Sequence, residues 1–474
     1  MKFTLQLVID NELGKSQIEK IIDLNKNNLP SYCLGLSLLE SKEILKNIQQ
    51  KMLITQTNEY LELQKVCSCC HQKRRIKGHE IFQYNTLFGT VVLPNLRFYH
   101  CHCNKTKDKS YSVLNDWLHE HNSPELQYIE TKWAAHFSYQ KTSELLQDLL
   151  PLPITHNAVT VKNHLHKIAK RQETELQEKP MCVSGCENEW AKLPKPDKPL
   201  IVGSDGGYVR SCYDKHKNFE VLVGKVYSET KPAKRFGLVQ SIDEKPQRRL
   251  LDVLRKQGFQ DNQQVTFLSD GAENVRDLQM MIMHPESEHV LDWFHLTMRF
   301  TVLKQFTQGL IKTDAETGKE VENDLTSAKW YLWHGNVKEA LKKLENCLVI
   351  FMAEDLEEVE KINYKNKKKM LKQLEELNTY VENNQHIIPN YGDRYRYGEA
   401  ISSSFVESTV NEVVTKRMVK KQQMQWSQKG AHYLLQARTA ALNGDLSDNF
   451  ERWYPGLKIK ETPMKQQQVL KEVA

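Results

Sequence analysis

The sequence VTFLSDGAENVRDLQMMIMHPESEHVLDWFHLTMR, residues 265–299, contains two short apolar runs that each end on an aspartate. The first run, Val265–Leu268, leads through Ser269 into Asp270, and the second ends on Asp292, three residues before His295. Strands that end on an acid and turn into a helix are typical of a parallel α/β sheet, in which ligand and metal groups gather at the carboxyl ends. The stretch therefore predicts a site at one edge of such a sheet.

Three more strands are expected before this stretch. LIVGSDGGYVR begins at Leu200 and carries Asp205, and it is followed by FEVLVGKVY (219–227) and RFGLVQ (235–240). Short turns between them predict an antiparallel meander, and a helix is expected at about 244–258. A ribonuclease-H-like fold has this order of elements: three strands, then a helix, a strand, a helix, a strand and a helix. Its first and fourth strands are central neighbours, which would bring Asp205 beside Asp270.

Two neighbouring carboxylates repel each other unless a divalent cation lies between them, and hard oxygen ligands select Mg²⁺ or Mn²⁺. Such a two-metal site serves phosphoryl transfer. Glu407 is the candidate third acid, on a helix predicted from SFVESTVNEVVTKRMVKK after the capping serines 402–404. Glu399 and Glu412 compete with it, and an acid in a first helical turn is also favoured simply by the helix dipole.

Composition limits the class of protein. The 474 residues carry 66 Lys plus Arg against 60 Asp plus Glu, a net charge of +6, so nucleic acid is a permitted partner but not a required one. The sequence contains no apolar run of about 18 residues and no signal peptide, which predicts a cytoplasmic protein without a membrane partner. The ten cysteines are then expected to be reduced or metal-bound.

A cysteine cluster predicts a structural Zn²⁺ site. Cys67 and Cys70 form a CxxC pair, and Cys101 and Cys103 supply a second pair after a predicted hairpin that turns at Phe88-Gly89. Cys69 and His71 compete as ligands, and ordinary buried cysteines are the alternative. Arg74 and Arg75 make this zinc-ribbon-like unit basic, which favours contact with DNA phosphates.

The following segment predicts helices. Ser123-Pro124 is a helix start, and a later helix carries Lys162, Asn163 and Lys167, which together favour a helix-turn-helix with the last helix in the major groove. A plain three-helix bundle with a solvated basic face explains the same pattern. Cys182 and Cys186 are expected to be free cysteines in a linker.

Residues between Phe300 and Tyr397 are expected to be all-helical. Their lysines, the loop before Glu407 and the helix after it provide further candidate DNA contacts, although a solvated face or core packing explains each residue singly. These candidates are Lys367, Lys368, Arg394, Arg396, Lys416, Arg417, Lys420, Lys421 and Trp426.

Several long motifs carry a family resemblance. GSDGGYVRS, LSDGAENVRDLQ, HVLDWFHLTMRF, NYGDRYRYGEAISSSFVESTVN and KRMVKKQQMQW resemble the transposases of bacterial insertion sequences of the ISKra family, related to the mutator-like group of DDE transposases. The resemblance covers nearly the whole chain. By motif, the acids of the family fall on Asp205, Asp270 and Glu407, and its Asp-x-x-His signature falls on Asp292 and His295. The crowded CSCCH departs from the plainer CxxC that the family implies.

The resemblance implies metal-dependent DNA cleavage and strand transfer, with double-stranded DNA of the element ends and of the target as partners, and a dimer or larger assembly on DNA near the nucleoid. His295 would position the scissile phosphate or pair with Asp292. A nuclease that does not join strands and a non-catalytic DNA-binding derivative are the alternatives. The expected division is a helical region (1–64), a zinc-ribbon-like unit (65–110), a helix-turn-helix domain (111–180), a linker (181–199), a catalytic core (200–300 and 397–474) and a helical insertion (301–396).

Overall fold

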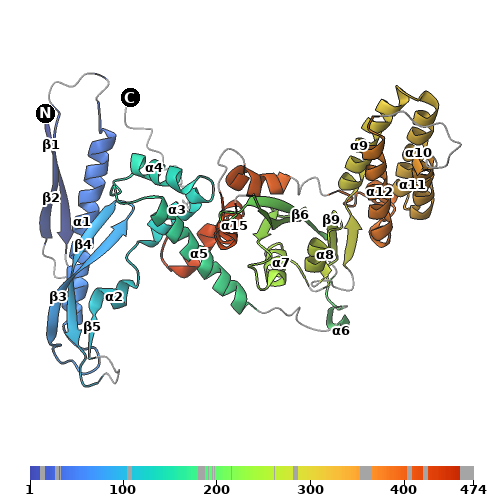
Figure 1. Cartoon of the computed structure of the whole chain (residues 1–474). Coiled ribbons are helices and arrows are strands. Elements are labelled where there is room, and N and C mark those ends of the chain that lie inside the picture. The colour runs from blue at the N-terminus through green and yellow to red at the C-terminus, as the bar shows by residue number, and fades with distance from the viewer. Residues whose placement is uncertain are drawn as a thin grey trace, which may run out of the picture. The chain divides into compact units, whose positions relative to one another are not determined.

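The computed structural model describes the 474 residues except 11–15, 27–30, 32–33, 104–108, 180–186, 191, 195, 197, 215, 261, 281–286, 353–364, 403–407, 420–424 and 460–474. The fold is mixed α/β, as the sequence predicts (Figure 1). The chain divides into two compact units: Met1–Lys170 with Gly444–Ala474, and Arg171–Asn443. Each unit is described separately below.

The N-terminal region corrects the prediction that residues 1–64 are helical. Strands β1 (Lys2–Asp10) and β2 (Ser16–Asn25) form an antiparallel hairpin, and only α1 (Leu38–Gln64) is a helix. In β1, Leu5, Leu7 and Ile9 are half-buried and alternate with exposed neighbours, which is the period of a strand. Ser37 and Glu40 form a reciprocal capping box at the start of α1.

The predicted hairpin around Phe88-Gly89 is present. Strands β3 (Ile76–Thr86), β4 (Gly89–Tyr99) and β5 (Ser110–Ser112) form a three-stranded antiparallel sheet, and the short helix α2 (Val113–Leu118) follows it. Leu93 and Phe98 of β4 are buried with Leu61 of α1 in one apolar core. This core holds the hairpin whose ends carry the cysteine pairs.

The helices expected after Ser123 are α3 (Pro124–Ala134), α4 (Tyr139–Leu149) and α5 (Ala158–Glu178), and α16 (Asp445–Trp453) packs against α3. The Ser123 side chain accepts a hydrogen bond from the Leu126 amide, as expected of a cap. Asn157 caps α5, because its side chain accepts from the amides of Val159 and Thr160.

A buried acid connects these helices. Glu130 of α3 is fully buried, and its carboxylate bonds to His156 Nε2 at 2.6 Å and to His164 Nδ1 of α5. Burial alone would raise the pKa of Glu130, but the hydrogen bonds from His156 and His164 outweigh it and hold that pKa below its usual range. The carboxylate therefore fixes α5 relative to α3.

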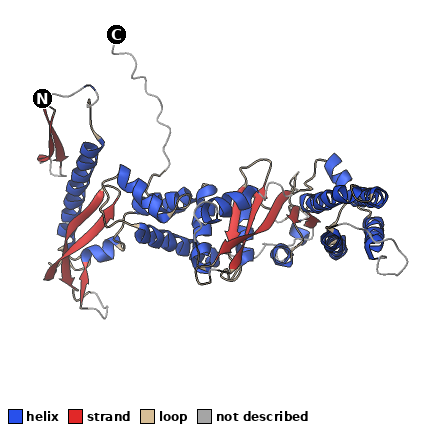
Figure 2. Ribbon diagram, turned by 45° about the horizontal axis from the view of Figure 1, so that its top comes forward, coloured by secondary structure: helices blue, strands red, loops and turns tan. Residues whose placement is uncertain are grey.

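The second unit is built on a five-stranded sheet with the order β10-β9-β6-β7-β8. Strands are drawn in red and helices in blue in Figure 2. The strands are β6 (Leu200–Arg210), β7 (Asn218–Tyr227), β8 (Lys234–Leu238), β9 (Val265–Ser269) and β10 (Glu288–Leu291). β6, β7 and β8 form the predicted antiparallel meander, whereas β9 pairs in parallel with both β6 and β10. The first and fourth strands of this unit are therefore neighbours, as the sequence predicts.

Different helices cover the two faces of this sheet. On one face, α7 (Pro246–Lys256) and α8 (Glu273–Met280) bury Leu250, Leu254 and Val275 against the strands. On the other face lie α15 (Gln428–Leu442) and η4 (Asn411–Val419), which is a π-helix. A Cβ atom added to Gly207 of β6 would lie in ordinary van der Waals contact with the side chain of Val410, at 3.4 Å, so the residues that lead into η4 pack directly on this face of β6.

The residues after β10 are helical, as predicted. The elements are α9 (Trp293–Ile311), α10 (Ala315–Trp333), α11 (Val337–Met352), α12 (Lys367–Asn383), η3 (Gln385–Ile387) and α13 (Tyr391–Arg396). Buried Leu, Ala and Val side chains at helical spacing join these helices in one core that also includes Val290 and Leu291 of β10. The core thus attaches the helical region directly to the edge of the sheet.

Part of the predicted linker is described. The short helix α6 (Glu187–Trp190) lies within it, and Cys182 and Cys186 lie outside the described residues. Across the described part of the chain, no helix combines the length and apolar character that a membrane crossing requires.

Candidate functional site

Three aspartates hold the same register position on neighbouring strands. The last parallel pair between β6 and β9 is Gly203 with Leu268, so Asp205 and Asp270 each lie two residues beyond it. Leu291 of β10 pairs with Ser269, which places Asp292 level with Asp270. Residues at one level of adjacent parallel strands point to the same face. The three acids therefore form a row at the carboxyl ends of β9 and β10 and within β6.

Asp270 lies in a tight turn that is fixed by its neighbours. Its side chain accepts a hydrogen bond of 3.0 Å from the Ala272 amide, and Gly271 has a φ of +83°. A Cβ atom on Gly271 would lie 2.4 Å from Asn384 Oδ1, so both the backbone angle and the space require glycine. The phenol of Tyr380, in α12, donates a 2.7 Å hydrogen bond to the Asp270 carbonyl.

Asp292 and His295 form a pair at the start of α9. Asp292 is fully buried, and its Oδ1 accepts a 2.8 Å hydrogen bond from the Phe294 amide as the helix cap. Its Oδ2 lies 3.5 Å from His295 Nε2, and the His295 side chain remains 31% exposed. Asp292 therefore faces His295 while it caps the helix, and the exposed imidazole can still contact a ligand.

The pKa of Asp205 is raised, in part because the other two acids are near it. Burial raises the pKa of this half-buried carboxyl, and the negative charges of Asp270 and Asp292 raise it further, whereas the Gly206 amide and His295 oppose the shift. Gly206 donates a 2.7 Å hydrogen bond to Asp205 Oδ1. A positive charge between the acids would offset this repulsion.

Arg299 and Tyr380 belong to this site although they were not predicted from the sequence. The guanidinium of Arg299 lies 4.2 Å from the centre of the Tyr380 ring. Burial raises the pKa of Tyr380, and the charges of Asp270 and Asp292 add to the increase. Arg299 follows His295 by four residues on α9, a spacing that places both on one helix face and that would have identified it. No local signal in the sequence pointed to Tyr380.

The predicted third acid, Glu407, lies outside the described residues. Its two competitors are occupied by arginines. Glu412 pairs with Arg235 Nε at 2.7 Å, and Glu399 lies 3.3 Å from Arg394 Nη1. Both competing carboxylates are therefore paired with guanidinium groups, and the first described residue after Glu407 is Ser408.

Several predicted DNA contacts are exposed and free of the core. Arg75, Lys162, Asn163, Lys368 and Lys416 are exposed. Lys167 and Arg396 are exposed but pair with Glu120 and Asp393. Arg74 bonds to Gln64 and is half-buried, as is Lys367. Lys420 and Lys421 lie outside the described residues.

Three further predicted DNA contacts are buried or are paired with another residue of the protein. Arg417 is fully buried, and its guanidinium lies 5.3 Å from the ring centre of Trp426. Trp426 is 4% exposed and bonds through its backbone to Arg210 and Cys212 beside β6, so it cannot stack on a base. Arg394 forms a two-pronged pair with Glu288 at 2.7 and 2.8 Å, which fixes α13 to β10.

The four predicted cysteines come together. Cys67, Cys70, Cys101 and Cys103 place their sulfurs within 4.8 Å of one another, a Cys₄ cluster that could bind a zinc ion. The competitors Cys69 and His71 are exposed and do not belong to it. The pairs come from the turn after α1 and from the segment between β4 and β5. Among the described residues this is the one group of three or more His, Cys, Asp or Glu side chains whose ligand atoms lie that close.

A tight turn prepares the first cysteine pair. The Cys67 amide donates a 3.0 Å hydrogen bond to the Gln72 carbonyl, and the His71 amide donates one of 2.9 Å to the Cys67 carbonyl. His71 adopts a positive φ of 53°. Amide groups of Cys70 and Cys69 and the Cys101 thiol lower the pKa of Cys67 to about 5, with the Cys70 amide contributing most. The turn thus favours the thiolate, which is the form that binds metal.

No protein-family model matches the chain, and no curated protein matches it significantly.

Proposed function

We propose that this protein is a DDE transposase that binds the ends of an insertion sequence and carries out metal-dependent cleavage and strand transfer of DNA. The observation that carries the proposal is the shared register of Asp205 and Asp270 on the central parallel pair of the sheet. The strand order β10-β9-β6-β7-β8 is the order of a ribonuclease-H-like core. The family resemblance of the surrounding motifs supports the same reading.

Asp205 and Asp270 would hold Mg²⁺ or Mn²⁺ together with Glu407. Val410 and Val414 contact the face of β6 at Gly207, and Asp205 shares that face because side chains alternate along a strand. Glu407 lies outside the described residues and precedes Val410 by three positions, a stretch of chain that spans at most about 10 Å. When bound, the ions would activate the attacking water or 3′-hydroxyl and stabilise the leaving oxygen.

The other residues of the site have distinct proposed roles. Asp292 holds the imidazole of His295, and His295 positions the scissile phosphate through its exposed ring. Arg299, held against Tyr380, supplies a permanent positive charge one helical turn further along α9. Tyr380 positions Asp270 through the bond to its carbonyl. In this proposal the phosphodiester would lie between the carboxylates of Asp205 and Asp270 and the side chains of His295 and Arg299.

The first unit is proposed to recognise DNA. Exposed Lys162, Asn163 and Lys167 of α5 would contact the element end as a helix-turn-helix, and the Cys₄ cluster would bind one structural Zn²⁺. Arg75 would contact phosphates near it. Because two ends must be joined in one reaction, we propose a dimer or larger assembly on DNA, and hence association with the nucleoid.

The deciding experiment uses DNA that carries both ends of the encoding element, with cleavage and joined products resolved on gels in Mg²⁺. The wild-type protein should yield both, and Asp270→Asn should abolish both while end binding is retained. Asp277→Asn, at an exposed position on α8, is the matched control and should stay active. Cleavage without joined products would favour a simple nuclease, and wild-type binding without any cleavage would favour a non-catalytic DNA-binding protein.

A further inference from the structure

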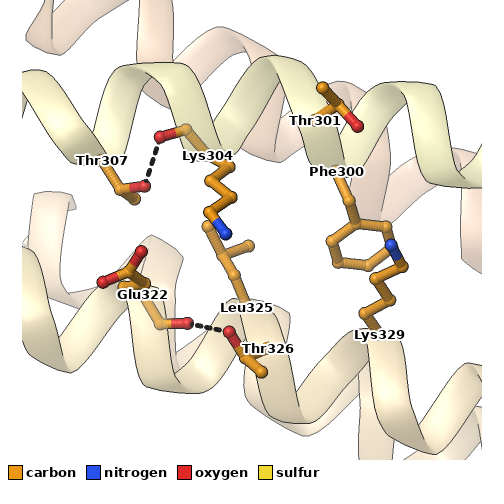
Figure 3. A pocket seen from close by; sticks show the side chains of 8 residues that line it. All are labelled: Phe300, Thr301, Lys304, Thr307, Glu322, Leu325, Thr326 and Lys329. Carbon is orange, nitrogen blue, oxygen red and sulfur yellow. Dashed lines mark hydrogen bonds between the residues drawn. The ribbon is translucent and has the colours of Figure 1, made fainter.

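A cavity of about 230 Å³ opens between α9 and α10 in the helical region (Figure 3). Its floor is apolar, because Phe300 and Leu325 are both nearly fully buried. Lys304 extends from α9 toward it, and Lys329 lies on the facing α10. The remaining lining residues are Thr301, Thr307, Glu322 and Thr326.

The hydrogen-bond donors that this cavity offers are cationic. Each threonine hydroxyl donates to a backbone carbonyl of its own helix, at 2.8 Å for Thr301 and Thr307 and 2.7 Å for Thr326. A hydroxyl that donates its one proton to the backbone is left as an acceptor. The two ammonium groups are therefore the donors available to a ligand, which selects an anion.

The lining residues of the cavity carry a net charge of +1, which suits a ligand group with one negative charge. Within the described part of the chain, neither Lys304 nor Lys329 pairs with an acid, whereas Lys342 and Lys343 on α11 pair with Glu339 and Asp324. Glu322 accepts a 2.8 Å hydrogen bond from Gln308. Two lysines and one glutamate leave a net charge of +1. A phosphodiester carries one negative charge and presents two free oxygens.

An aromatic side chain beside the cavity points to nucleic acid in particular. Trp330 is 57% exposed, an unusual state for tryptophan, and it follows Thr326 by four residues on the same face of α10. Its ring is supported by His334, with centroids 4.5 Å apart, and by Tyr331 at 5.5 Å. A supported, exposed ring one turn from a phosphate site is suited to stacking on a base.

We propose that the cavity between α9 and α10 binds a backbone phosphodiester of a DNA strand through Lys304 and Lys329, and that Trp330 stacks on a base of the same strand. The inference rests on the proposed function for the identity of the nucleic acid. It adds a contact site that is separate from the acidic row and from α5. DNA would therefore be held by the helical region as well as by the sheet.

The test measures binding of the full-length protein to two labelled probes of random sequence, a 30-base-pair duplex and a 30-nucleotide single strand, across a salt series. For both probes, Lys304→Gln with Lys329→Gln should lower the magnitude of the slope of log affinity against log salt by about one, and lower the affinity about eightfold at 0.1 M salt. The control variant combines Lys338→Gln on α11 with Lys319→Gln on α10, and it removes the same charge outside the cavity lining. Its slope should change by less than about half as much as that of the cavity variant. Trp330→Ala should weaken single-strand binding at least about fivefold, and Trp330→Phe should restore it.

The outcomes separate this inference from the proposed function. If the two double variants lose DNA affinity equally, the loss comes from the lower net positive charge of the protein, and the proposed phosphate site is overturned. Unchanged binding after removal of Lys304 and Lys329, in a protein that still cleaves element ends, would overturn this inference alone. A wild-type protein that binds neither probe would overturn both proposals.

Discussion

The phenol of Tyr380 donates a 2.7 Å hydrogen bond to the main-chain carbonyl of Asp270. The two residues are 110 positions apart, and the bond connects α12 of the helical region to the end of β9. Because Arg299 of α9 lies over the same ring, three elements meet at the strand end that carries the acid. The helical region therefore contributes to the shape of the proposed site.

Tyr380→Phe should test this connection. The change removes one hydrogen bond and keeps the ring beneath Arg299, so the free energy of unfolding should fall by about 1 kcal/mol. Binding of Mn²⁺, measured by calorimetry, should weaken as well, because Asp270 loses its positioning contact. Tyr395→Phe on α13 is the control, since Tyr395 is 67% exposed, and it should change neither quantity. Equal effects from the two variants would show that Tyr380 has no special role.

Asp205→Asn should stabilise the metal-free protein. The pKa of Asp205 is raised by burial and by the neighbouring acids, so the carboxyl favours folding when protonated, and that contribution is lost as pH rises through its folded pKa. At neutral pH the variant should raise Tm by about 2 °C or more. The gain should shrink as pH falls below the folded pKa of Asp205. Adding Mg²⁺ should raise the Tm of the wild type and not that of the variant.

A lower Tm for Asp205→Asn at neutral pH would contradict this account of the acidic row. Asp277→Asn serves again as the control, because its exposed side chain lies outside the row. Its Tm should follow that of the wild type at every pH.

Cys70→Ser should abolish zinc binding, whereas Cys69→Ser should not. Cys70 belongs to the four-sulfur cluster, and the neighbouring Cys69 is exposed and outside it. Metal analysis should find about one zinc per chain in the wild type and in Cys69→Ser. Cys70→Ser should contain no zinc and should lose hydrogen-exchange protection in β3 and β4, since zinc binding stabilises the fold around its ligands. A wild-type protein purified without chelators that holds no zinc would refute the zinc site.

Glu130→Gln should destabilise the three-helix segment by about 3 kcal/mol, because it removes the buried charge that His156 and the half-buried His164 contact. The pKa of Glu130 is held low, so its contribution is present at neutral pH and is lost as pH falls through the folded pKa. The difference in Tm between the wild type and the variant should therefore disappear at acid pH. Glu125→Gln, exposed in the first turn of α3, should cost no more than about 1 kcal/mol.

The sequence by itself determined the features that depend on neighbouring residues. Short apolar segments located β6, β7 and β9, the Ser123-Pro124 pair located the start of α3, and the spacing of the cysteines identified the cluster. Each of these signals is local, because capping, strand alternation and a metal-binding turn involve residues only a few positions apart. The error at residues 2–25 came from assigning a helical period to a segment that alternates with a period of two.

Only the tertiary structure decided which side chains face solvent and which distant residues meet. Arg417 and Trp426 are buried against each other, and Arg394 pairs with Glu288, although in the sequence all three belong to basic segments typical of DNA contacts. Tyr380 reaches Asp270 because α12 packs back onto the sheet edge. Charge and residue type are set by the sequence, but exposure and long-range pairing depend on how the elements pack, since one helix face can be turned toward water or toward the core.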